Sequence, residues 1–164
     1  QDEVFNLKVY QKVNSIYLSD KLFYHYYIYK VGNTRSRFIP NRFEIYKSIY
    51  NHFMDLKKAW QISDERFEDA MQKRFYASIS ESLLFNLFHK DCPWNKQEKK
   101  QELHRIMHDE QVAHTMAYMK KQKIGWEQKL YYAAFSKESL FLISLYRNIF
   151  LGLRKIKSAL WSKK

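Results

Sequence analysis

The stretch SDERFEDAMQKRFYASISESLLFNLFH, residues 63–89, decides the fold of this chain. Ser63 followed by Asp64 and Glu65 is typical of a helix start, because an oxygen-bearing side chain caps the first turn and negative charge suits the helix dipole. Apolar residues then recur at helical spacing, which predicts one long amphipathic helix with a face for burial. These residues are Phe67, Met71, Phe75, Ile79, Leu83 and Phe88.

The sequence on either side of this stretch predicts more helices. Asn41 fits the cap of a helix that precedes it. Asn95 with Glu98 three residues later has the spacing of a capping box. Ser136 is expected to cap the last helix, which ends in basic residues. The helices expected around the central stretch span about 41–60, 96–107, 109–122, 126 onward and 137–160.

The first 40 residues have a different pattern. Asp2 and Glu3 lie in the first turn of an expected helix whose apolar face carries Val4 or Phe5, Val9 and Val13. Residues 15–18 and 22–31 are typical of two short strands joined by a turn. The expected fold is therefore mainly α: an N-terminal helix and a short β-hairpin, followed by a multi-helix bundle with a basic amphipathic C-terminal helix.

The composition favours an anionic partner. The chain has 164 residues, with 29 Lys and Arg against 17 Asp and Glu and a net charge of +12, so phosphorylated substrates, anionic lipid and nucleic acid are all candidates. The basic residues are scattered among acidic ones and no nucleic-acid-binding motif is present, which argues against nucleic acid. The single cysteine, Cys92, cannot form an internal disulfide and fits a reducing cytoplasm.

Three motifs, in this order, resemble the C-terminal part of bacterial family 2 glycosyltransferases. They are QDEVFNLKVY at 1–10, IYLSDKLFYHY at 16–26 and NTRSR at 33–37. Members of that family often have Glu-Asp-x-x-Phe-x-Leu-Lys in this helix, then a strand ending in Asp-Lys-x-Leu-Tyr-x-Tyr, then a loop with Ser and Arg. Gln1 replaces the usual Glu, and Asp2 stands at the position of the second acid. The resemblance covers residues 1–40, and the rest only by its helical character.

The resemblance implies roles for individual residues. Asp2 would be the general base that removes a proton from the acceptor hydroxyl as this attacks the anomeric carbon with inversion. Arg35, Ser36 and Arg37 would bind the donor diphosphate or the acceptor, since guanidinium groups suit phosphate; the alternative is a solvated loop. His25 is either a half-buried strand residue or a metal ligand or contact to the acceptor.

The resemblance also implies a division of the chain and a missing part. Residues 1–40 would end a catalytic GT-A region, and residues 41–164 would form a C-terminal helical domain. The nucleotide sugar and a divalent cation, Mg²⁺ or Mn²⁺, would be held by an N-terminal domain with an Asp-x-Asp motif, which this sequence lacks. The expected function is that of a cytoplasmic glycosyltransferase fragment, inactive alone and without its own cofactor. The full enzyme would extend a glycan or lipid-linked acceptor in cell-surface polysaccharide synthesis, such as a capsule.

The last expected helix combines an apolar run with a basic end. The run before Arg147 is shorter than the roughly 20 residues that span a bilayer. Such a helix can lie peripherally in the headgroup layer of an anionic membrane, at the inner face of the plasma membrane, or its apolar residues can pack on the preceding helices. Both alternatives stay open, as does a non-catalytic membrane-adapter or nucleic-acid-binding module. The residues expected at a membrane surface are Arg147, Arg154, Lys155, Lys157 and Trp161.

Two histidines one helical turn apart, His104 and His108, raise the question of a metal site. The segment lacks the glutamate of a His-Glu-x-x-His helix, and a zinc ion would need a third ligand placed by the fold. His114 is the next histidine along the chain. The sequence alone therefore predicts no metal site.

Overall fold

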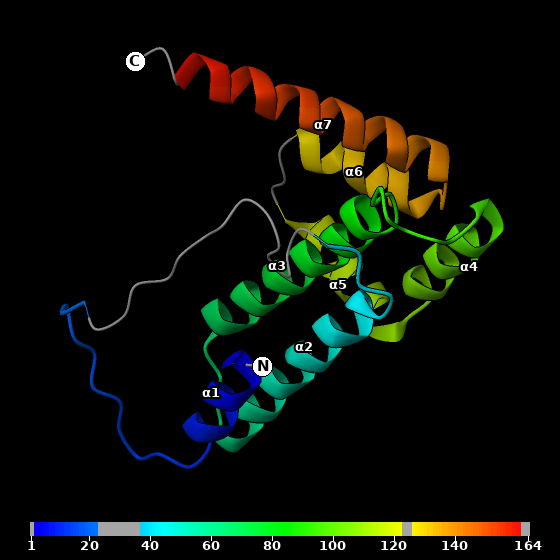
Figure 1. The fold of residues 1–164 in the computed structure, drawn as a ribbon. Coiled ribbons are helices and arrows are strands. Elements are labelled where there is room, and N and C mark those ends of the chain that lie inside the picture. Colours follow the sequence, from blue (N-terminus) through cyan, green and yellow to red (C-terminus); the bar gives the residue numbers. More distant parts are fainter. Residues whose placement is uncertain (1, 23–36, 123–125, 162–164) are drawn as a thin grey trace.

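The computed structural model of the chain describes residues 2–22, 37–122 and 126–161, and for residues 2, 126–128 and 153–161 it describes the backbone alone. These residues form helices, and from residue 42 onward the connections between the helices are short (Figure 1). The mainly helical fold predicted from the sequence is confirmed. The elements are α1 (Asp2–Tyr10), α2 (Arg42–Ala59), α3 (Glu65–Glu81), the π-helical η2 (Ser82–Asn86), α4 (Lys96–Met107), α5 (Glu110–Lys121), α6 (Trp126–Ser136) and α7 (Leu140–Trp161).

The central helix, α3, begins and packs as its sequence predicts. The side chain of Asp64 accepts a hydrogen bond from the backbone N–H of Arg66 at 2.8 Å, which satisfies one of the free donors of the first turn. Phe75, Ile79 and Leu83 are buried along one face. α3 packs against α2 and α5, and continues without interruption into η2.

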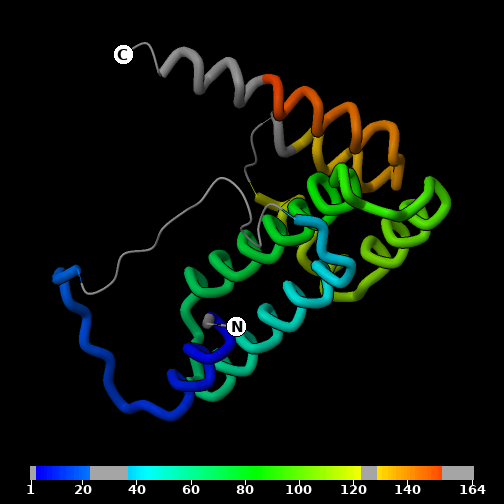
Figure 2. The backbone as a smooth tube through the Cα atoms, in the orientation of Figure 1, coloured from blue at the N-terminus to red at the C-terminus, as the bar shows by residue number. Residues whose placement is uncertain are grey.

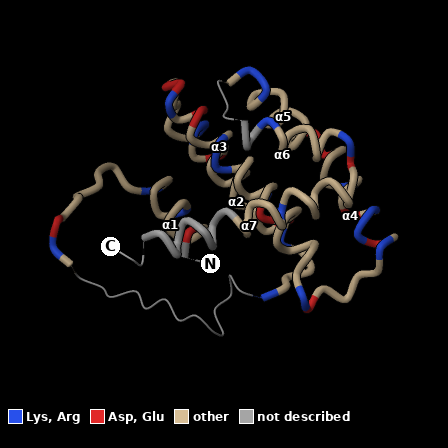
Figure 3. Tube along the Cα trace, turned by 90° about the horizontal axis from the view of Figure 1, so that it is seen from above, with Lys and Arg blue, Asp and Glu red and all other residues tan. Residues whose placement is uncertain are grey.

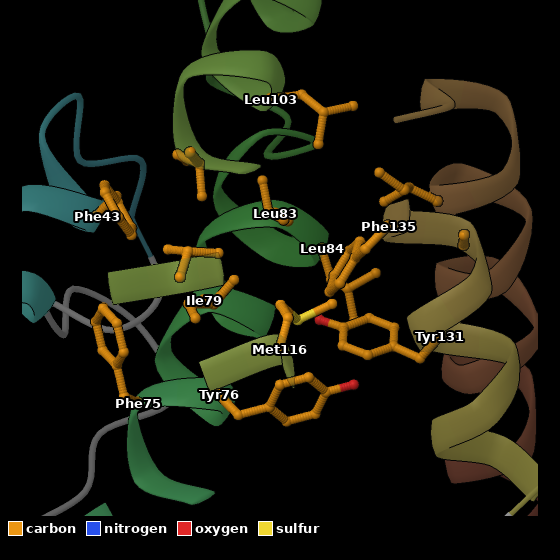
Figure 4. Close-up of a cluster of buried hydrophobic side chains, with 14 of the residues drawn as sticks. Phe43, Phe75, Tyr76, Ile79, Leu83, Leu84, Leu103, Met116, Tyr131 and Phe135 are labelled. Atoms are coloured by element: carbon orange, nitrogen blue, oxygen red, sulfur yellow. The ribbon is translucent and has the colours of Figure 1, made fainter. Parts of the chain in front are cut away.

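The core lies where α3 and η2 meet the other helices (Figure 4). Figure 4 shows Phe43 and Phe75 at one end of this cluster, with Tyr131 and Phe135 of α6 at the other. α6 and α7 lie side by side near the η2 end of α3, whereas α1 lies near its other end (Figures 1 and 2). α7 also contacts η2 and α4, so the C-terminal helix is part of the bundle.

A buried polar network joins α2, α3 and α5. Gln72 is fully buried on α3, and its amide nitrogen donates to the Tyr50 hydroxyl at 2.9 Å and to Glu68 Oε1 at 2.7 Å. Its amide oxygen accepts from Thr115 Oγ1 at 2.7 Å. Because buried polar groups must be paired, these bonds fix the relative register of the three helices.

Part of the N-terminal prediction is wrong. Residues 15–18 form no strand, and no strand occurs among the described residues. Tyr17 and Leu18 are 91 % and 87 % exposed, so the segment lacks the packing that a two-stranded hairpin needs for stability. The second expected strand, 22–31, lies outside the described residues except for Leu22. In α1, the buried apolar residue is Leu7 rather than Phe5 or Val9.

The start of the last helix also differs from the prediction. Ser136 does not cap α7 but is the final residue of α6. Ser139 takes this place, and its hydroxyl oxygen accepts the backbone N–H of Leu142 at 3.4 Å. The reason is Glu138, whose φ of 45° ends α6 in the left-handed conformation and delays the next helix by three residues.

Candidate functional site

A polar cavity of about 360 Å³ lies between α1, α2 and α3. The side chains around it include two carboxylates, two phenols, a guanidinium and a hydroxyl, together with three apolar side chains. This mixture offers donors and acceptors of hydrogen bonds next to aromatic rings, as ligand sites commonly do. The lining residues are Glu3, Tyr46, Ile49, Tyr50, Arg74, Phe75, Ala77, Ser78 and Glu81.

Two contacts position α1 over this cavity. Leu7 is buried as α1 packs on α2. The carboxylate of Glu3 forms an ion pair with Arg74 on α3. The Arg74 guanidinium also lies over the ring of Phe53, at 5.1 Å from its centroid. The start of α1 is therefore held at the cavity by both an apolar and a charged contact.

A second charged network reaches the cavity at Glu81. The buried Arg42 donates to Glu81 Oε1 at 2.6 Å, to Asn86 Oδ1 at 3.1 Å and to the backbone oxygen of Arg37 at 2.7 Å. The pKa of Tyr46 is raised, first by burial and then by its hydrogen bond to the Glu81 carboxylate. Tyr46 therefore stays protonated and can donate a hydrogen bond at neutral pH.

The short π-helix η2 anchors the segment that leads into α2. Asn86, at its end, accepts from the backbone N–H of Ile39 at 3.0 Å and donates to the carbonyl of the same residue at 2.8 Å. The ring of Phe38 packs edge-on against Trp94, with centroids 5.2 Å apart. Residues 38 and 39 are thus attached to the helical body through Trp94 and Asn86.

The structure describes only some of the residues predicted from the resemblance. Asp2 is the first residue of α1, beside Glu3 in the cavity wall, and its side chain is outside the description. Arg37 is exposed, and its carbonyl accepts from Arg42. His25, Arg35 and Ser36 lie outside the described residues, so their roles stay predictions.

The other side chains of the cavity are not among the residues predicted from the sequence. Arg74, Ser78 and Glu81 are spaced at i, i+4 and i+7 along α3, and so form a polar stripe beside the buried apolar one. Tyr46 and Tyr50 are likewise one turn apart on α2. This spacing was a usable signal, but only the fold shows that the two stripes face the start of α1.

The C-terminal helix has one buried and one exposed apolar side. Ile143 is fully buried, and the ring of Phe150 lies 6.3 Å from that of Phe85 in η2. On the other side, Phe141, Leu145 and Ile149 are 74 %, 46 % and 49 % exposed, at successive turns. Packing on the preceding helices therefore accounts for only one side of α7.

The charged residues predicted at a membrane surface lie along α7. Arg147 is half-buried and its guanidinium lies 3.4 Å from Asn148 Oδ1. For Arg154, Lys155, Lys157 and Trp161 the structure describes the helical backbone alone. Figure 3 shows Lys and Arg spread over most of the described helices, with Asp and Glu among them. Within the described part of the chain, no helix is both long and apolar enough to cross a bilayer.

Comparisons with protein-family models, with curated proteins and with solved structures found no match to this chain. The resemblance to family 2 glycosyltransferases therefore stays a prediction from the motifs of residues 1–40.

Proposed function

We propose that this chain is the acceptor-side and C-terminal helical part of an inverting glycosyltransferase, which transfers a sugar from a nucleotide sugar to a glycan or lipid-linked acceptor. One observation carries the proposal: Glu3, the neighbour of Asp2, lines a polar cavity together with Tyr46 and Arg74. The residue that the family motif assigns as the base therefore begins the helix that borders a cavity with groups suited to a sugar's hydroxyls.

Each group at this site has a chemical role in such a transfer. Asp2 takes the proton of the acceptor hydroxyl while the oxygen of that hydroxyl bonds to the anomeric carbon of the donor sugar. The nucleoside diphosphate leaves with the electrons of the broken bond. The paired Glu3 and Arg74 hold the start of α1 in place. Tyr46, whose O–H donates to Glu81, offers its oxygen as the acceptor of a hydrogen bond from a sugar hydroxyl. The donor and its Mg²⁺ or Mn²⁺ belong to the upstream domain that the resemblance implies.

The test measures sugar transfer by the natural protein encoded by the gene. Its intact mass should be well above the 20.2 kDa of this chain, because a donor-binding domain is needed. Asp2→Asn should lower kcat by at least about 100-fold and leave the KM for the donor nearly unchanged, since a general base acts in the transition state. Asp55→Asn, at an exposed position on α2, is the matched control.

Two outcomes would contradict this function. A natural protein with the mass of this chain alone would have no donor site for Asp2 to serve. Near-normal turnover of the Asp2→Asn enzyme, with the Asp55→Asn enzyme equally active, would show that Asp2 is not the general base.

A second candidate function concerns the membrane surface. We propose that α7 lies on an anionic bilayer, because Phe141, Leu145 and Ile149 form an exposed apolar row on a helix whose later residues include Arg154 and Lys155. The apolar row would enter the headgroup boundary, and the net charge of +12 would attract the anionic lipid.

Vesicle sedimentation tests this attachment. The chain should bind vesicles that contain phosphatidylserine and should not bind pure phosphatidylcholine, and salt should weaken the binding. The triple variant Phe141→Gln/Leu145→Gln/Ile149→Gln should lose most of it, whereas Ile45→Gln, an exposed apolar residue on α2, should retain it. Equal binding by all three proteins would show that the apolar row of α7 does not bind the vesicles.

A further inference from the structure

Three metal-binding side chains meet on the side of the bundle formed by α4 and the turn between α6 and α7. His104 lies in the last turn of α4, His108 is the residue that ends this helix, and Glu138 lies in the turn. Glu138 Oε2 lies 2.8 Å from His104 Nδ1, and Glu138 Oε1 lies 2.9 Å from His108 Nε2. One ligand atom from each residue lies within 4.8 Å of the other two.

This spacing matches what a zinc ion requires. Zinc binds imidazole nitrogen and carboxylate oxygen at about 2.0–2.2 Å, so the donor atoms of a tetrahedral site lie roughly 3.3 Å from one another. The two N–O distances, 2.8 and 2.9 Å, are hydrogen-bond lengths somewhat shorter than this, so an ion would replace both hydrogen bonds. The two imidazole rings already lie close, with centroids 4.0 Å apart.

The backbone around the cluster is fixed on both sides. α4 is held by a capping box at Asn95 and by the buried Leu103 and Ile106. The turn is held by Phe135, which is fully buried and whose carbonyl accepts the Glu138 N–H at 2.8 Å. Ligands on such fixed elements lose little freedom on binding an ion.

The conformation of Glu138 is unusual for its residue type. Its φ of 45° is in the left-handed region, where a residue other than Gly is strained by about 1–2 kcal/mol and Gly or Asn is preferred. Strain of this kind concentrates where a side chain has a function. At this position the strained residue is the one that brings a carboxylate to the two histidines.

The local field also favours a cation. α4 and α6 both end next to the cluster, and a helix C-terminus carries partial negative charge from its free carbonyl groups. Glu138 adds a full negative charge. The side chains of His104 and His108 are 63 % and 60 % exposed, so an ion can enter and water can complete its coordination.

We propose that His104, His108 and Glu138 form a zinc site that clamps the α6–α7 turn to the end of α4. The sequence supplies the pair of histidines, and the fold supplies the third ligand from 30 residues beyond His108. The site is independent of the proposed transferase function, because it lies on other helices than the cavity.

Titration of the full chain with ZnCl₂ after chelator treatment, without a polyhistidine tag, tests the site. We expect one equivalent of zinc to bind and the Tm to rise with zinc concentration. Co²⁺ in place of zinc should give the intense visible absorption of a tetrahedral ion. His104→Gln and Glu138→Gln should each weaken zinc binding by at least about tenfold, since even an outer-shell change costs this much.

Two further variants separate loss of the ligand from loss of the fold. Glu138→Gly removes the carboxylate at a φ that glycine adopts without strain, so this variant should fold and still lose the zinc-dependent rise in Tm. His52→Gln, on α2 and bonded to the carbonyl of Ser48, should bind zinc as the unmodified chain does.

The absence of saturable binding by the unmodified chain would overturn the proposal. So would equal zinc affinity in the chain and its Glu138→Gly and His104→Gln variants, because the ion would then be bound elsewhere.

Discussion

Gln72 shows how much of the structure depends on a single side chain. It is a fully buried polar residue in a helix whose other inward positions are apolar, and its amide satisfies groups on three helices. An apolar residue at this position would fit the volume and leave the hydroxyls of Tyr50 and Thr115 without this partner. Gln72 therefore contributes specificity: its hydrogen bonds form in only one relative register of α2, α3 and α5, whereas other registers could bury the same apolar area.

We expect Gln72→Leu to lower the free energy of unfolding by about 2 kcal/mol, because buried donors lose their partner. Urea denaturation of the variant measures this change. The double variant Gln72→Leu/Thr115→Val should recover part of the loss, since the hydroxyl at 115 is then absent as well. Gln101→Leu, at an exposed position on α4, is the control. A loss no larger than that of the control would show that the network contributes nothing to stability.

At the scale of single elements, the helices that carry a cap and an apolar period in their own sequence were predicted correctly. The capping box of Asn95 and Glu98 forms as predicted, with both reciprocal hydrogen bonds, and α4 spans the residues expected. Asp109 caps α5 through its side chain alone, which accepts from the backbone N–H groups of Gln111 and Val112. These elements were predictable because a cap and an apolar period act within a few residues of each other.

Other elements depend on contacts that no local pattern contains. η2 departs from the α-helix so that the N–H of Leu87 bonds to the carbonyl of Ser82 at 3.1 Å, which turns Asn86 toward Ile39. The segment 15–18 has residue types typical of a strand, but Tyr17 and Leu18 are exposed and no strand pairs with it among the described residues, so β propensity alone does not form a strand here. A pattern predicts an element only where the rest of the fold supplies what the element needs.

We expect Asn86→Ala to release the segment that enters α2. The variant loses hydrogen bonds to both backbone groups of Ile39 and to Arg42, at a cost of about 2–3 kcal/mol in the free energy of unfolding. Hydrogen exchange at the Ile39 amide should accelerate far more than exchange in α4, because the change is local. Asn14→Ala, in the exposed segment after α1, should change neither. Unchanged exchange at Ile39 would mean that other contacts hold this segment.

At the scale of the whole molecule, both candidate sites join residues far apart in the sequence. Glu3 pairs with Arg74 across 71 positions, and His104 meets Glu138 across 34. Each partner lies in an element with its own local reason to form. Their pairing depends on how α1 and the α6–α7 turn pack, and this is why the sequence indicated Asp2 and the two histidines but neither the cavity nor the third ligand.

The net charge of +12 predicts how the stability of the whole molecule depends on salt. Repulsion among the basic residues opposes the compact state, whereas exposed pairs such as Arg66–Asp64 and Lys73–Asp69 contribute little. Raising the ionic strength from about 0.01 M to about 0.15 M shortens the screening length from about 30 Å to about 8 Å. We expect repulsion to be reduced more than attraction, so the Tm measured by circular dichroism should rise with NaCl.

The variant Lys100→Glu/Lys120→Glu, at two exposed positions, should have a higher Tm than the unmodified chain in low salt, and its Tm should rise less with NaCl. A Tm that falls as salt is added would mean that ion pairs, such as those of Arg42 and Arg105, outweigh the charge excess.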